Sequence, residues 1–307
     1  MNLKKLPFPE KQALKNSLLI NLIFNTMLRN AKKMLQQAKK SKKAIGAFNV
    51  SSVEALQAVF MAAKSAKSEV IIEASKGESK HFSPELLASI CLKLSDIYEV
   101  DYALHLDRGQ NIHWIKRCLD AGFNSVTAES TNPDKKMSIE KTIEIRELTN
   151  KYGAQLEGAI EVVPLRYYKN KMQKRLDITD PSQAKKFVNR TGVDSLVISI
   201  GTQSGRYKSV DNIRYDVLKK ANELLPDTPF VLHGGSFLPK EVCRKCINNG
   251  IAKINVNSEL RLAYTSALKG NIRIKPEEYA PYRLLKGAKE AMGHIVSEKI
   301  KIFSEIV

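Results

Sequence analysis

Residues 44–66 read AIGAFNVSSVEALQAVFMAAKSA, and this stretch places a short apolar segment directly before a helical pattern. Residues 44–48 have the length and composition of a buried strand, and apolar residues recur at helical spacing over 53–66. The same order repeats along the chain. Seven further strands are predicted, each followed by a helical pattern: 69–74, 101–106, 125–128, 155–160, 195–200, 230–233 and 252–256.

Eight strand-then-helix units in one chain favour an α/β fold of the parallel (β/α)8 TIM barrel type. A doubly wound open sheet has the same order of elements and stays open on pattern alone. However, no glycine-rich dinucleotide fingerprint follows the first strand, where Gly46-Ala-Phe-Asn49 stands. An extra C-terminal helix is predicted over 282–302. Barrel-like patterning starts at Met27, so we divide the chain into a barrel (27–307) and an N-terminal extension of unknown role (1–26).

Composition limits the class of protein. The chain has 307 residues, of which 43% are hydrophobic, and this suffices for one large core. No run of about 18 apolar residues occurs, so no membrane span is expected. The apolar stretch 18–24 lacks the cleavage site of a secretory signal. Few cysteines in a long chain indicate a reducing compartment, so we expect a cytoplasmic protein.

The four cysteines include one closely spaced pair, Cys243 and Cys246. A structural zinc site needs four ligands, and no second pair of Cys or His lies at a suitable spacing. We therefore predict that these two residues are simply two positions on one helix.

The formal net charge is +18, which suits an anionic partner such as nucleic acid, a membrane surface or a phosphorylated small molecule. The lysines are spread along predicted helices, and no nucleic-acid-binding motif accompanies them. A solvated lysine-rich surface accounts for this charge, so we expect neither a membrane nor a nucleic acid as the partner.

Polar side chains follow the predicted strands at their C-terminal ends, where a barrel enzyme forms its active site. Four of them are acidic or imidazole-bearing: Asp107, Glu129, Glu157 and His233. Carboxylates in such a cleft suit proton abstraction or metal binding. The ends of the last three strands are instead rich in Gly, Ser and Asn. Backbone N–H groups and a helix N-terminus favour a phosphate site there, with ordinary turn glycines as the alternative.

Several motifs together resemble the class II, zinc-type ketose-bisphosphate aldolases, in order from about residue 27 to residue 302. They are AIGAFNV at 44–50, HLDRG at 105–109, CLDAGFNSV at 118–126, RTGVDSLVISIGTQSGRYK at 190–208, VLHGGS at 231–236 and KINVNSELRLAY at 253–264. The resemblance implies a (β/α)8 barrel that forms a homodimer or homotetramer. It also implies a lyase of glycolysis and carbohydrate metabolism, which cleaves a ketose bisphosphate to dihydroxyacetone phosphate and an aldehyde. A zinc ion polarises the ketone in that reaction.

The resemblance assigns the catalytic acid/base to Asp107 and one retained zinc ligand to His233, with Glu157 as a possible ligand. The family's other two zinc-binding histidines are Arg108 and Ser204 in this chain. The candidate phosphate- and substrate-binding residues are Asn49, Gly205, Lys208, Gly235, Ser236 and Asn255, with Asn257 and Ser258 where the family has Asp and Thr. The basic stretch 166–175 replaces a glycine-rich acidic loop.

Arg108 and Ser204 determine whether this chain can bind the family's zinc ion. A guanidinium is always protonated and offers no lone pair, so Arg108 opposes a dication at that position. Either Arg108 replaces the metal as an electrophile or anion-binding group, or the site has decayed and Arg108 pairs with Asp107, Glu129 or Glu157. We expect zinc to be absent or weakly bound.

Three hypotheses for the function follow. The first is a zinc-deficient family member that still binds a phosphorylated sugar or triose, as a binding protein or as an enzyme with altered chemistry. The second is an active, divergent, metal-dependent fructose- or tagatose-bisphosphate aldolase that uses His233, Glu157 and another group. The third is a basic nucleic-acid or protein-interaction module. Metal content separates the first two, and salt-dependent binding to non-specific DNA tests the third.

Overall fold

The computed structural model describes residues 27–129, 135–160 and 178–305, and its eight strands form a closed barrel in sequence order. Every neighbouring pair of strands is parallel, including β8 with β1, so the predicted TIM barrel is confirmed. The strands are β1 (Ile45–Asn49), β2 (Val70–Ser75), β3 (Tyr102–Gly109), β4 (Ser125–Glu129), β5 (Gln155–Ala159), β6 (Ser195–Val197), β7 (Phe230–Leu232) and β8 (Ile251–Val256).

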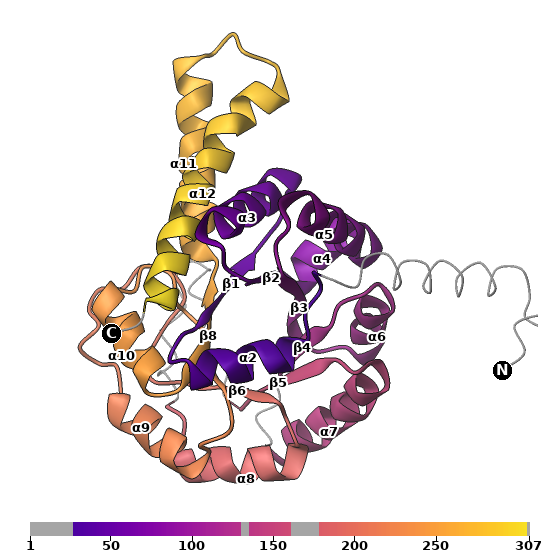
Figure 1. The fold of residues 1–307 in the computed structure, drawn as a ribbon, viewed down its shortest axis with the longest axis vertical. Coiled ribbons are helices and arrows are strands. Elements are labelled where there is room, and N and C mark those ends of the chain that lie inside the picture. Colours follow the sequence, from indigo (N-terminus) through magenta and orange to yellow (C-terminus); the bar gives the residue numbers. More distant parts are fainter. Residues whose placement is uncertain (1–26, 130–134, 161–177, 306–307) are drawn as a thin grey trace, which may run out of the picture.

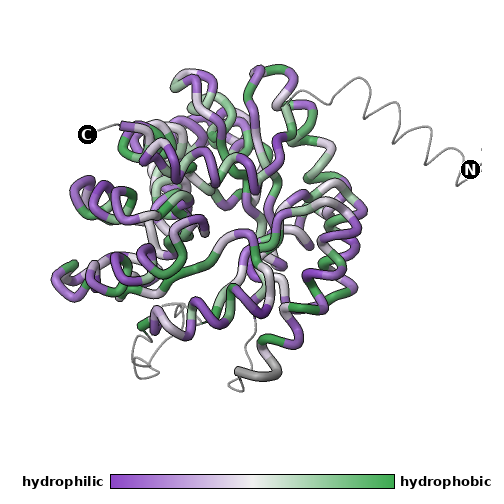
Figure 2. The backbone as a smooth tube through the Cα atoms, turned by 60° about the horizontal axis from the view of Figure 1, so that its bottom comes forward, coloured by the Kyte–Doolittle hydropathy of each residue, from purple (hydrophilic) through white to green (hydrophobic). Residues whose placement is uncertain are grey.

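Helices form the outer layer of the barrel (Figure 1). Hydrophobic and hydrophilic residues alternate along them, as expected for helices that bury one face against the strands (Figure 2). They are α2 (Ala31–Lys40), α3 (Val53–Ala66), α4 (Lys76–Phe82), α5 (Pro84–Tyr98), α6 (Ile112–Asp120), α7 (Lys135–Tyr152), α8 (Pro181–Thr191), α9 (Tyr215–Leu224), α10 (Lys240–Asn248), α11 (Ser258–Ile274) and α12 (Pro281–Ser304). The extra helix predicted over 282–302 is α12.

Helix α2 lies across one end of the barrel (Figure 1). Its buried side chains, among them Met34 and Leu35, form a cluster with residues from the N-terminal halves of β1, β2, β3 and β8. This packing closes the N-terminal end of the barrel and leaves a functional site to the opposite end. Just before α2, the chain pairs with β3, because Tyr102 N donates to Met27 O at 2.8 Å. The predicted extension (1–26) and the basic stretch 166–175 lie outside the described residues.

Helices α11 and α12 extend together beyond the barrel wall (Figure 1). The C-terminal part of α12 returns to the barrel and buries Val296, Ile300 and Phe303. Phe303 O accepts a hydrogen bond from Ala44 N at 3.0 Å, which ties α12 to the start of β1. The last helix is therefore part of the barrel's core as well as of the projecting pair.

Cys243 and Cys246 both lie on α10, as predicted, and both are buried. Burial raises the pKa of the Cys243 thiol to about 11 and that of Cys246 to about 12. Neither thiol therefore ionises readily at neutral pH. Over the described residues, no helix has the length and apolar character needed to cross a membrane.

Candidate active site at the C-terminal end of the barrel

The end of β3 carries Asp107 and Arg108 and departs from regular strand geometry. Its register with β4 shifts between Leu106 and Gly109, and Arg108 adopts a left-handed backbone conformation with φ of 61°. That conformation is unfavourable for a large side chain and is found most often where function or packing requires it. Neighbouring Asp107 is buried, and its Oδ1 has no hydrogen-bond partner among the described residues. A ligand proton could satisfy this oxygen.

Arg108 pairs with a carboxylate of the next strand. Its Nη1 lies 2.6 Å from Oε1 of Glu129, at the end of β4, and both side chains are largely buried. Gln110 donates to the other carboxylate oxygen, with 3.2 Å between Nε2 and Oε2. Of the three carboxylates considered as partners of Arg108, Glu129 is the one that the structure brings to it.

A buried polar layer fills the barrel interior below these strand ends. Lys253 of β8 lies between two carboxylates, with Nζ 2.7 Å from Glu73 Oε1 and 2.7 Å from Glu157 Oε2. The same ammonium group lies 3.2 Å from Nε2 of His105. All four side chains are fully buried. Because an unpaired charge would be very unfavourable here, each of these groups depends on the others.

The two carboxylates of this layer differ in protonation. Burial raises the pKa of Glu73 to about 8, since the attraction of Lys253 only partly offsets the loss of solvation. Burial also opposes ionisation of Glu157, but the ammonium group of Lys253 outweighs it and holds the pKa of Glu157 well below its usual range. At neutral pH, Glu73 therefore keeps a proton while Glu157 forms the ion pair with Lys253.

His105 is neutral, because burial and then Lys253 lower its pKa to about 3. Its Nδ1 lies 2.5 Å from Ser125 Oγ, and that hydroxyl donates to Gln155 Oε1. On the other side of the ring, Nε2 lies 2.8 Å from Thr127 Oγ1 and 3.2 Å from Lys253 Nζ. His105 thus links the two hydroxyl groups of β4 to the lysine of β8.

The side chains near the retained histidine do not fit a three-ligand zinc centre. His233 Nε2 lies 3.5 Å from Glu157 Oε1 and 3.4 Å from Asn255 Nδ2. Both oxygens of Glu157 are engaged, Oε1 by Thr127 and Oε2 by Lys253. A catalytic zinc ordinarily takes three protein ligands. Within the described ranges, no three His, Cys, Asp or Glu side chains are grouped so that they could share a metal ion.

Glycines let the end of β7 approach its neighbours closely. Gly234 has φ of 78°, and a Cβ there would lie 2.6 Å from Gln203 O. A Cβ on Gly235 would lie 2.2 Å from Ile254 Cγ2. The N–H of Gly235 donates to Asn255 O at 3.0 Å, so it is engaged within the protein. Gly235 therefore serves the close contact of β7 with β8, and a phosphate would need other donors.

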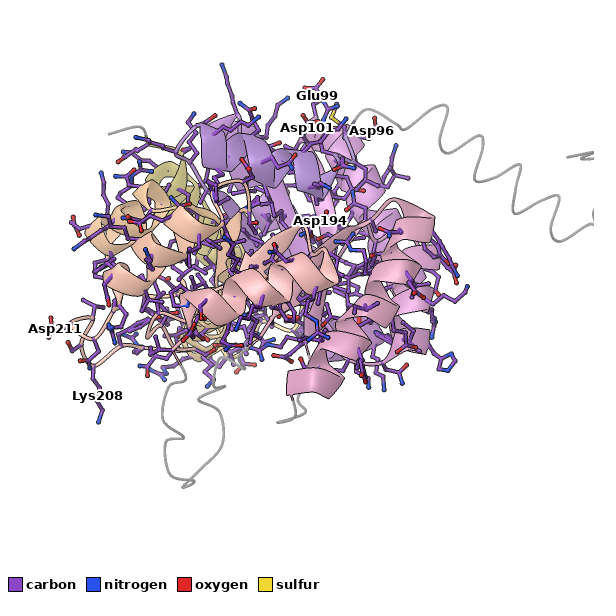
Figure 3. All side chains as sticks on the ribbon, turned by 90° about the horizontal axis from the view of Figure 1, so that it is seen from below. Asp96, Glu99, Asp101, Asp194, Lys208 and Asp211 are labelled. Atoms are coloured by element: carbon purple, nitrogen blue, oxygen red, sulfur yellow. The ribbon has the colours of Figure 1, made fainter. Side chains whose placement is uncertain are left out.

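The segment after β6 lies at the edge of the site. Gly205 has φ of 85°, a conformation that favours glycine, and a Cβ there would meet nothing within 4 Å. Lys208 is exposed, and Figure 3 shows its side chain pointing away from the ribbon into solvent. Ser204 is partly buried. The structure thus does not bring Lys208 into contact with the other predicted site residues.

Asn49, at the end of β1, is held by a contact that the sequence did not reveal. Its Nδ2 donates to Glu78 Oε2 at 3.0 Å, and Ser75 N donates to the same oxygen at 2.8 Å. Glu78 Oε1 also lies 2.5 Å from Arg261 Nη2 of α11. Asn49 is therefore held by α4, and Glu78 links it to α11, at the same end of the barrel as Asp107.

Sequence reasoning missed several residues that hold this site together: Glu73, Glu78, Lys253 and Arg261. A signal existed for two of them. Lys253 and Glu73 are the single charged residues, of opposite sign, in two mostly apolar strands, IAKINV and VIIEAS. A buried charged side chain needs a partner, so an ion pair between these two residues is the simplest expectation.

A closed eight-stranded barrel with carboxylates, one histidine and glycine-rich turns at its C-terminal end is the architecture of many enzymes of small phosphorylated substrates. A model of the family "Fructose-bisphosphate aldolase class-II" matches residues 29–306. Because this match spans nearly the whole chain, the protein belongs to the class II fructose-bisphosphate aldolase family.

Solved structures agree with this assignment. The YdjI aldolase from Escherichia coli K12 is 29% identical in sequence, and the match covers 91% of this chain and 98% of that one with a TM-score of 0.76. The fructose-bisphosphate aldolase from Campylobacter jejuni shares the fold at 20% identity, with 93% of this chain and 97% of that chain covered and a TM-score of 0.74.

Proposed function

We propose that this family member binds a phosphorylated triose or ketose at the C-terminal end of the barrel, and that metal-dependent aldol cleavage is lost or altered. The contact between Arg108 and Glu129 carries this proposal, with Nη1 and Oε1 2.6 Å apart. A guanidinium at a family zinc-ligand position repels a dication, and it has no lone pair to donate. Ser204 removes a second imidazole from the same set.

Asp107 and the phosphate-binding positions support retained binding. Asp107 keeps a buried oxygen without a partner among the described residues, so it could accept a proton from a substrate hydroxyl. Zinc polarises the ketone in the family, however, so cleavage without zinc would lack that electrophile. The hydroxyl of Ser236 is a donor for phosphate that does not depend on the metal, and each charge-assisted hydrogen bond contributes about 1.5–3 kcal/mol.

Metal analysis and calorimetry on the same preparation test the proposal. We expect protein purified without chelators to contain little zinc and to bind dihydroxyacetone phosphate or inorganic phosphate weakly. Lys208→Ala should weaken phosphate binding about tenfold if the exposed ammonium folds over the bound anion. Lys219→Ala, which removes an exposed lysine on α9, is the matched control. No binding of trioses or hexoses at millimolar concentration would refute the binding half of the proposal.

An active, divergent metal-dependent fructose- or tagatose-bisphosphate aldolase is the second candidate. Retention of Asp107 and of His233 beside Glu157 favours it. It requires near-stoichiometric zinc that is lost in His233→Ala, together with cleavage of a ketose bisphosphate. Binding to non-specific DNA that weakens steeply with salt would instead support the basic interaction module.

We also propose a cytoplasmic homodimer or homotetramer. The projecting α11–α12 pair supports assembly, since it exposes large apolar side chains at Ile272, Ile274, Tyr279 and Tyr282. Ile274 is 76% exposed and Tyr279 is 91% exposed. An exposed apolar patch commonly marks an interface, and these four side chains would form one if they lie together. Sedimentation velocity with an Ile274→Lys variant tests it, and an unchanged sedimentation coefficient would rule this surface out.

A further inference from the structure

The N-terminus of α11 is capped by a residue from another loop. Its own N-cap residue, Asn257, makes no side-chain cap hydrogen bond. Instead, the hydroxyl of Ser236, which follows β7, accepts from Asn257 N at 3.1 Å and from Glu259 N at 3.3 Å. In return, Glu259 Oε2 accepts from Phe237 N at 2.8 Å. This is the reciprocal pattern of a capping box, here divided between the first turn of α11 and the turn after β7 that carries Ser236 and Phe237. We call these the divided capping box and the β7 turn.

A third element closes this arrangement. Lys299, near the end of α12, lies with Nζ 3.0 Å from the same Glu259 Oε2. The lysine side chain is 2% exposed and the glutamate side chain is 13% exposed, so this ion pair is largely withdrawn from water. Loss of either partner would leave a buried charge without compensation. Lys299 therefore holds the Glu259 carboxylate in place, where it accepts from the N–H of Phe237 in the turn after β7.

The turn needs this support because its backbone is strained. Phe237 has φ of 61°, which a non-glycine residue adopts only when the surroundings hold it there. The N–H of Phe237 is the group that Glu259 holds. The ring of Phe237 in turn packs against the segment after β6, with Arg206 Cζ 4.9 Å from the ring centroid. The turn's conformation thus also affects the neighbouring strand end.

The divided box fixes the direction in which Ser236 can donate. A hydroxyl has two acceptor lone pairs and one proton. Both lone pairs of Ser236 take N–H groups from α11, so only the proton remains, and no acceptor faces it among the described residues. Ser236 is 3% exposed, and the helix N-terminus beside it favours negative charge. The hydroxyl is thereby prepared to donate to an anion.

We propose that Lys299 and Glu259 are positioning residues for anion binding, which act at a distance by fixing the turn that carries Ser236. The proposal rests on the proposed phosphate binding, and it adds that α12 controls affinity without touching the ligand. Neither residue needs to meet the phosphate. Their effect passes through the N–H of Phe237 and the hydroxyl of Ser236.

The test measures dissociation constants for dihydroxyacetone phosphate and for inorganic phosphate by calorimetry. We expect Lys299→Met to weaken both by about tenfold, which corresponds to about 1.4 kcal/mol. Lys299→Arg keeps the charge and should restore most of the affinity. Lys301→Met, which removes an exposed lysine from the same helix, should change nothing. If Lys299→Met does not fold, Glu259→Gln replaces it, because the amide retains an acceptor for Phe237 N and loses only the charge.

A second readout does not depend on the ligand. With 15N-labelled phenylalanine, the amide resonance of Phe237 should move in Lys299→Met and Glu259→Gln and stay in place in Lys301→Met. Unchanged affinity in Lys299→Met, with wild-type protein that binds phosphate, would overturn the positioning role. If the wild-type protein binds neither anion, the proposed function fails instead. The Phe237 resonance then still decides whether α12 sets the turn, and an unmoved resonance overturns the present inference.

Discussion

The two halves of the barrel's C-terminal end are held by different kinds of contact. On the side of β3 to β5, charged side chains pair with one another, as Arg108 does with Glu129. On the side of β7 and β8, backbone N–H groups and a hydroxyl form the divided capping box around Ser236, and Lys299 supports it from α12. The groups that hold Ser236 come from α11 and not from β3 to β5, so Arg108 and Glu129 could change without removing them. This separation makes binding without metal chemistry a coherent outcome.

The largest expected effect is a gain of zinc when the two missing histidine ligands, at positions 108 and 204, are restored. Arg108→His together with Ser204→His adds two imidazoles beside His233, and we expect about one zinc per chain where the wild-type protein has little. Arg117→His, which adds a histidine at an exposed position on α6, should bind none. Metal analysis after gel filtration measures the content. A double variant without metal would show that groups around the ligands, such as Asn255 beside His233, no longer orient them.

The buried layer lies under both halves, so its disruption should destabilise the whole barrel. Lys253→Met leaves Glu73 and Glu157 facing each other without a cation. Breaking a buried ion pair by removing one partner costs about 3–5 kcal/mol, and we expect the free energy of unfolding in urea to fall by that amount. The exposed-site variant Lys219→Met is the control. Adding Glu157→Gln to Lys253→Met should recover part of the loss, and a drop no larger than the control's would contradict the ion-pair interpretation.

A smaller effect on stability should come from the protonation of Glu73, which differs from that of Glu157. Burial raises the pKa of Glu73 from 4.5 to about 8. Between these values the folded state keeps a proton that the unfolded state releases. The contribution of Glu73 to the free energy of unfolding is therefore fully present below pH 4.5 and is lost as the pH rises through 8. This free energy falls by up to about 1.4 kcal/mol per pH unit.

Glu73→Gln removes that proton exchange, so the variant should gain stability relative to the wild type as the pH rises. Urea unfolding at several pH values across this window measures the difference. In Glu241→Gln, at an exposed position on α10, the free energy of unfolding should change with pH as it does in the wild type. If Glu73→Gln also shows the wild-type pH dependence, Glu73 is ionised at neutral pH and the assignment of the buried proton is wrong.

The two halves also differ in how far the sequence alone could describe them. Short apolar strands and helical spacing predicted the order of eight strand–helix units, which favoured the barrel, because strand burial follows directly from apolar composition. For Arg108 the sequence left three carboxylates open, and the register of β3 with β4, in which Gly109 pairs with Ala128, selects Glu129. The contacts of Ser236 could not be predicted, since Glu259 lies 23 residues further along the chain. Non-local caps of this kind leave no short motif to recognise.

The smallest effect concerns the end of the barrel away from both halves. A chain that begins at Met27 should unfold as cooperatively as the full chain, with the same midpoint and the same phosphate affinity. Barrel patterning and the first described backbone pairing both start there, with Tyr102 N donating to Met27 O and Arg29 N donating to Tyr102 O at 2.7 Å. Removing four more residues breaks this pairing, so a chain that begins at Ala31 should be less stable by about 1–3 kcal/mol. A large loss on removing only residues 1–26 would show that they pack on the barrel or in an interface between subunits, and the division of the chain at Met27 would then be wrong.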